Sequence, residues 1–105
     1  MTEWSVIMSK RARADLDAIY EYIAFTLLEP ENAYNQTTRI RNAISSLNHF
    51  PERCPSFTRE PLRSKGLRYL MTDNYITMFK LSKLKKVVTI VTINYAKRNL
   101  ANILK

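Results

Sequence analysis

Residues 66–95 read GLRYLMTDNYITMFKLSKLKKVVTIVTINY, and this stretch decides the fold. It contains three runs that are rich in β-branched and aromatic residues, at Leu67–Met71, Tyr75–Leu81 and Val87–Ile93. Residues of these types favour strands. Only three residues separate the first two runs, and five separate the last two. Connections this short join neighbouring antiparallel strands, so the stretch predicts a three-stranded antiparallel meander.

Two amphipathic helices are predicted before the meander. Ser9 is a good N-cap, because its hydroxyl accepts a backbone N–H of the first turn. Pro30 suits the first position of a second helix, where its missing N–H has no effect. Only a few residues join the helices, so they are expected to be antiparallel neighbours. Each has one apolar stripe, formed by Ala12, Leu16, Ile19, Ile23 and Leu27 in the first helix and by Ala33, Thr37, Ile40, Ile44 and Leu47 in the second.

The rest of the chain completes an α+β fold. Trp4–Met8 alternates as a short strand does, three prolines mark an irregular loop over residues 51–65, and residues 96–105 favour a short C-terminal helix. The predicted order is strand, two-helix antiparallel hairpin, three-stranded meander and terminal helix. The helices are expected to cover one face of the sheet, which leaves the opposite face open to a partner.

Length and charge indicate one basic domain. A chain of 105 residues has room for a single domain over residues 1–105. Its formal net charge is +8, and from Arg59 onward eleven basic residues stand against two acidic ones. A field of that sign attracts polyanions or an acidic protein partner. With one cysteine, no leader pattern and no apolar run long enough to span a membrane, we expect a cytoplasmic protein without membrane contact.

Several chemistries are poorly supported by the composition. The single histidine, His49, and the single cysteine, Cys54, have no evident third ligand, so we expect no metal site. One glycine is too few for a phosphate-binding loop or a dinucleotide motif, so we expect no cofactor. The carboxylates are expected on helical surfaces rather than near the sheet, which argues against paired-carboxylate catalysis.

Basic and aromatic residues are predicted to gather on the sheet side. Arginine binds phosphate with two parallel hydrogen bonds, and aromatic rings stack on unpaired bases, so such a set suits single-stranded RNA. Each strand tyrosine is more often a packing residue, however. An arginine inside an apolar strand must face the open side of the sheet or be paired. The set is Arg59, Arg63, Lys65, Arg68, Tyr69, Tyr75, Tyr95, Lys97 and Arg98.

The order of elements, together with five short motifs, resembles the RelE/ParE superfamily of type II toxins over nearly the whole chain. The motifs are Ser9, Ala12, Asp15, Leu16 and Ile19–Ile23 in the first helix, then Ile44, Leu47, Phe50 and Pro51 closing the second, Gly66-Leu67-Arg68-Tyr69-Leu70, Asn74-Tyr75-Ile76 with Phe79, and Val91–Tyr95 followed by Lys97-Arg98.

The resemblance implies a toxin that is neutralised by a cognate antitoxin, often one that is acidic where it wraps the toxin. Some members of the superfamily cleave messenger RNA on the ribosome through attack by the ribose 2′-hydroxyl. Others inhibit DNA gyrase without cleaving anything, and the fold alone does not choose between these activities.

The nuclease interpretation gives roles to particular residues. Arg68 and Arg98 match arginines of the RNA-cleaving members, and Arg68 would stabilise the charge that develops on the phosphate. Tyr95 would replace a missing near-terminal acid–base residue, although Pro61 stands where a lysine is expected. Arg59, Arg63, Lys65, Tyr69 and Lys97 would bind RNA. The charge slightly favours this ribosome-dependent endoribonuclease, while the missing acid–base residues and the long hairpin motivate the alternative, a non-enzymatic gyrase inhibitor.

Overall fold

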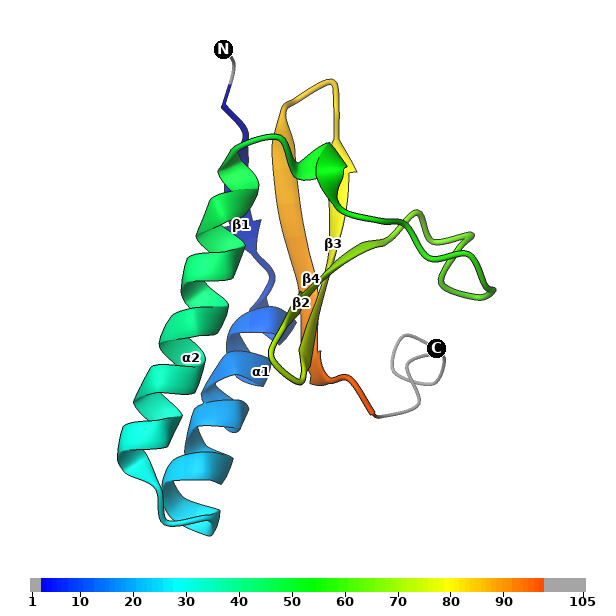
Figure 1. Ribbon diagram of the computed structural model, residues 1–105. Helices are drawn as coiled ribbons and strands as arrows, with labels where there is room; N and C mark the ends of the chain where they lie inside the picture. The colour runs from blue at the N-terminus through cyan, green and yellow to red at the C-terminus, as the bar shows by residue number, and fades with distance from the viewer. Residues whose placement is uncertain (1–2, 98–105) are drawn as a thin grey trace.

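The protein is an α+β domain, as predicted, in a computed structural model that describes residues 3–97. Two antiparallel helices, α1 (Lys10–Glu21) and α2 (Pro30–Ser45), pack against the same face of a twisted sheet. Figure 1 shows that this helical hairpin extends past the end of the sheet, so the sheet does not cover its tip.

The sheet has four strands in the order β1-β4-β3-β2. The predicted meander is formed by β2 (Arg68–Thr72), β3 (Tyr75–Ser82) and β4 (Val87–Tyr95), all of which pair antiparallel. The first strand, β1 (Ser5–Met8), joins the sheet as a parallel neighbour of β4. Such a parallel pair needs a long crossover, which the helical hairpin and the meander provide.

Both predicted helix starts are confirmed. The Ser9 hydroxyl accepts the N–H of Ala12 at 3.0 Å and donates to the carbonyl of Val91 at 2.9 Å. One side chain therefore caps α1 and also ties the start of that helix to β4. Pro30 is the first residue of α2, where no backbone N–H is needed.

The end of the first helix departs from the predicted pattern. Its last turn widens into a π-helix over Tyr22–Thr26, in which Leu27 donates its N–H to the carbonyl of Tyr22 at 3.0 Å. A π turn holds more residues than an α turn and so rotates the positions that follow it. Leu27, expected on the buried stripe, follows the π turn and is exposed, whereas Ile23 near the start of that turn is buried.

The main core lies between the hairpin and the sheet. It is formed by the stripes of both helices and the inward residues of β3 and β4, including Leu16, Ile40, Phe79 and Ile90, all of which are buried. All five predicted stripe residues of the second helix and its extension are buried.

The opposite face of the sheet is not left open, contrary to the prediction. Leu62 and Leu67 of the loop before β2 are buried against Ile76 and Met78 of β3, and they form a second small core. Figure 1 shows this loop projecting on the side away from the helices. Apolar side chains on both faces of β3 need cover, and the loop supplies it.

The predicted C-terminal helix falls mainly outside the described residues. Ala96 and Lys97 form a turn after β4, and residues 98–105, with Arg98, lie beyond the described part of the chain. Within that part, no helix has both the length and the apolar character that crossing a membrane requires.

Candidate functional site

Arg68 begins β2 and lies directly opposite Phe79, on the face that carries the main core. Its guanidinium donates to the carbonyl oxygen of Cys54 at 2.7 Å and approaches that of Glu52 at 3.4 Å. The side chain is half-buried, and among the described residues no carboxylate forms an ion pair with it. Arg68 is therefore a paired arginine that fastens the proline-rich loop to the edge of the sheet.

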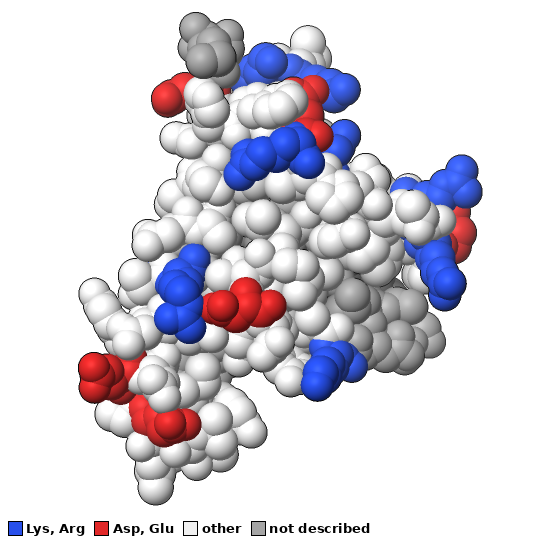
Figure 2. Space-filling view, in the orientation of Figure 1, with Lys and Arg blue, Asp and Glu red and all other residues white. Residues whose placement is uncertain are grey.

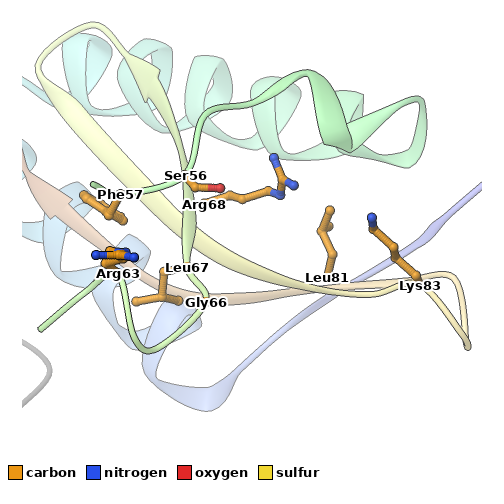
Figure 3. A pocket seen from close by; sticks show the side chains of 8 residues that line it. All are labelled: Ser56, Phe57, Arg63, Gly66, Leu67, Arg68, Leu81 and Lys83. Atoms are coloured by element: carbon orange, nitrogen blue, oxygen red, sulfur yellow. The ribbon is translucent and has the colours of Figure 1, made fainter. Parts of the chain in front are cut away.

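A shallow cavity of about 430 Å³ lies beside Arg68 and is basic. Arg63 and Lys83 also line it, together with Ser56, Phe57 and Leu81. Figure 3 shows the Arg68 side chain extending away from Phe57 and Arg63, toward Leu81 and Lys83. No Asp, Glu or His is among the described residues of this wall, so the cavity offers positive charge without a general base.

The other predicted RNA-binding residues are spread over the surface. Arg59, Lys65 and Lys97 are exposed, and the first two belong to a tight series of turns that Glu60 stabilises by accepting hydrogen bonds from the N–H and hydroxyl of Ser64. Tyr69 points to the second core, where its ring packs on Phe57 with 4.7 Å between centroids. Tyr69 is thus a packing residue.

Tyr95 does not join Arg68. It pairs with Tyr75 in the sheet, four residues along β3 from the partner of Arg68, which corresponds to roughly 13 Å along the strand. The rings of Tyr75 and Tyr95 meet edge to face at 5.8 Å. Burial raises the pKa of Tyr75, and the neighbouring Tyr95 and Tyr22 raise it further, so this phenol stays neutral at physiological pH.

A second cavity, of about 740 Å³, opens between the first helix and the end of the sheet. Tyr22 and Leu27 line it on the helical side, and Tyr75 and Tyr95 on the sheet side. Asp15 is also among the residues that line it. The three tyrosines make it an aromatic groove, quite unlike the basic cavity beside Arg68.

The sequence predicted that Asp15 lies on the helical surface. This prediction is wrong, because Asp15 is half-buried and contacts β4. Its Oδ2 accepts the hydroxyl of Thr92 and the N–H of Ile93, the latter at 3.0 Å. The Asn94 amide donates to the same hydroxyl at 2.9 Å. The spacing does place Asp15 beside the buried stripe, because it follows Ala12 by three residues, but it does not indicate the partner on β4.

Cys54 is not a reactive thiol. It is buried in the main core, and burial raises the pKa of its thiol, although the neighbouring Arg53 and Arg68 partly oppose this. A thiol with a raised pKa is a poor nucleophile near neutral pH. Among residues 3–97, no three His, Cys, Asp or Glu side chains form a group suited to a metal ion.

Charge divides the molecule into two regions. Residues 14–38 hold five of the nine acidic residues, namely Asp15, Asp17, Glu21, Glu29 and Glu31, and not one Lys or Arg. Figure 2 shows acidic side chains, and no basic ones, over the lower end of the hairpin, while basic groups lie on the protruding loop and at the upper end. The overall charge of +8 conceals this acidic region, which is why composition alone missed it.

Comparison with known proteins gives consistent results. The model of a family described as the ParE toxin of the type II toxin–antitoxin system parDE matches residues 6–100. The chromosomal ParDE toxin–antitoxin system of P. aeruginosa has a chain 24% identical in sequence with a TM-score of 0.74, and the match covers 92% of this chain and 100% of that one. A chain of the RelBE2 toxin–antitoxin complex of Mycobacterium tuberculosis is 17% identical with a TM-score of 0.62, and coverage is 89% and 98%. None of the curated proteins matches.

Proposed function

Because this chain belongs to the ParE toxin family of type II toxin–antitoxin systems, we propose that it arrests growth by binding DNA gyrase and not by cleaving RNA. The observation that carries this proposal is the position of Arg68. Its guanidinium is already bonded to the carbonyl of Cys54, and the residue proposed to act with it, Tyr95, lines a different cavity. Cleavage needs phosphate-binding and proton-transfer groups within reach of one phosphate.

One observation favours the alternative, a ribosome-dependent endoribonuclease. Arg63, Arg68 and Lys83 line the same cavity, and three cations so placed would attract a phosphate. In that case Arg68 would stabilise the charge on the scissile phosphate, while the exposed Arg59 and Lys65 would hold flanking nucleotides.

The proposed partner in the resting cell is a cognate antitoxin with an acidic segment. The turn between β3 and β4 carries three exposed lysines, Lys83, Lys85 and Lys86, and only Lys83 has a carboxylate nearby among the described residues, Glu52 at 3.7 Å. An acidic segment would lower the repulsion within this group of like charges. The same attraction would speed the encounter of toxin and antitoxin.

A supercoiling assay tests the proposed target. Purified toxin added to gyrase, ATP and relaxed plasmid is expected to inhibit supercoiling in proportion to its concentration. Toxin mixed beforehand with the antitoxin is the control, and it is expected to leave supercoiling intact. Full supercoiling at a tenfold molar excess of free toxin would contradict the proposal.

Replacing Arg68 with alanine is expected to weaken the fold but to leave growth arrest in place. The Cys54 carbonyl loses its charged donor, and hydrogen bonds to charged groups contribute about 1.5–3 kcal/mol. Urea denaturation measures the loss, and induction at a temperature at which the variant is folded measures toxicity. The control is Arg63→Ala, because that side chain is exposed and its loss should change stability by under about 0.5 kcal/mol. A folded Arg68→Ala variant that no longer arrests growth would favour the nuclease.

A further inference from the structure

The tip of the helical hairpin, defined as residues 21–34, exposes an unusual amount of apolar surface. Phe25 is 70% exposed, Leu28 is 78% exposed, and Tyr22, Leu27 and Tyr34 are exposed as well. Single apolar residues are common on protein surfaces, but five large exposed ones within the fourteen residues of this tip favour an interaction site.

Leu28 is exposed and also has an unfavourable backbone conformation. The Glu29 N–H bonds back to the carbonyl of Ile23 at 3.0 Å, six residues earlier, which closes the helix end in the manner of a Schellman motif. This closure holds Leu28 at a φ of +58°, where glycine or asparagine is usual and a leucine is strained. Neither the backbone conformation nor the packing of the free protein favours leucine at position 28. We therefore infer that Leu28 contributes to contact with a partner.

The aromatic groove continues this surface toward the sheet. Tyr22 and Leu27 belong both to the tip and to the wall of the 740 Å³ cavity, whose far side is formed by Tyr75 and Tyr95. The π turn over Tyr22–Thr26 produces this arrangement, because it turns Leu27 out of the core. A short apolar segment of a partner would meet both the exposed apolar side chains of the tip and a recess for an anchoring side chain.

The negative charge of the tip favours a partner that carries positive charge. The tip contains three carboxylates, Glu21, Glu29 and Glu31, and no basic residue. Nucleic acid would be repelled by them. Two tips from separate copies would repel each other in the same way, so this surface is poorly suited to symmetric self-association.

We propose that the hairpin tip and the aromatic groove together bind a segment of the toxin's target protein that combines apolar side chains with Lys or Arg. This rests on the proposed function in one respect, namely that the target is a protein. The cationic side chains of the segment pair with Glu21, Glu29 and Glu31, and an apolar side chain enters the groove between Tyr22 and Tyr95. The surface is separate from the basic region proposed for the antitoxin's acidic segment.

The experiment compares tip variants for growth arrest, stability and binding to the antitoxin. Phe25→Ser combined with Leu28→Asn removes the apolar patch, and Glu21→Lys reverses one charge at a helix end that tolerates a lysine well. Leu84→Asn is the matched control, because Leu84 is 95% exposed in the turn between β3 and β4, far from the tip along the chain. Asparagine also adopts positive φ more readily than leucine, so Leu28→Asn alone is expected to keep Tm or raise it by up to about 5 °C.

The tip variants are expected to need at least tenfold more protein to arrest growth, while Leu84→Asn matches the wild type. Antitoxin binding is expected to stay within twofold of the wild type for each tip variant. Tip variants as toxic as the wild type would overturn the inference, and so would a joint loss of toxicity and antitoxin binding. The supercoiling assay separates the two proposals: if wild-type toxin spares gyrase while the tip variants still lose toxicity, the target is another protein and the docking surface stands.

Discussion

Replacing Phe79 with alanine is expected to lower the free energy of unfolding by about 3–5 kcal/mol. Phe79 is fully buried in β3, at the centre of the core between the helical hairpin and the sheet. Truncation removes its transfer free energy from water and leaves a cavity that Leu16 and Ile40 cannot fill without moving the helices. Since a whole domain is stable by about 5–15 kcal/mol, the variant should be close to unfolded at 37 °C. Urea denaturation at 10 °C, followed by circular dichroism, measures the change.

Met71→Ala in the neighbouring strand is the control. Met71 is 47% exposed, so its truncation is expected to lower stability by no more than about 1 kcal/mol. Equal urea midpoints for the two variants would show that the hairpin does not depend on Phe79 for its attachment to the sheet.

The second large effect is expected from Asp15→Ala, which should lower the free energy of unfolding by about 3 kcal/mol. The carboxylate is the partner of both the Ile93 N–H and the Thr92 hydroxyl. Its removal leaves two polar groups of β4 without their charged acceptor, at about 1–3 kcal/mol for each buried group. Thermal unfolding measures the stability, and hydrogen exchange at the Ile93 amide reports on the contact itself.

Asp15→Asn separates charge from geometry. The amide oxygen still accepts one hydrogen bond but carries no charge, so this variant is expected to fall between the wild type and Asp15→Ala. An Ile93 amide that exchanges equally slowly in all three proteins would mean that Asp15 does not fasten α1 to β4.

Local chemistry made much of the fold predictable. Ser9 and Pro30 signal helix starts through a side-chain acceptor and a missing donor, and both act within one turn. The short connection over 72–74 favours pairing between the strands on either side of it, and β2 and β3 do pair antiparallel. Signals of this kind depend only on nearby residues, and a sequence displays them directly.

The features that the sequence did not predict depend on contacts beyond the nearest residues. The π turn at Tyr22–Thr26 breaks the periodicity from which the burial of Leu27 was predicted. The bond from Arg68 to Cys54 joins residues 14 positions apart across an irregular loop, and that from Asp15 to Ile93 spans 78. Contacts of such separation depend on how the finished layers meet, which no local pattern encodes. The placement of Arg98 lies outside the described residues.

The candidate site was likewise predictable in its local features and not in its long-range contacts. The sequence predicted a basic loop and basic strand ends, and the structure places Arg63 at the same cavity as Arg68. It could not place Tyr95 away from them, because that separation is set by strand register. Nor did the net charge reveal the acidic tip, whose carboxylates are outnumbered by cations elsewhere.

Mapping the 5′ ends of cellular messages after induction of the toxin, without its antitoxin, tests most directly whether it acts by binding or by cleavage. Binding to gyrase predicts that growth stops and a DNA-damage response rises while messages keep their normal ends. New ends in phase with codons, absent when the Arg68→Ala variant is induced, would contradict it.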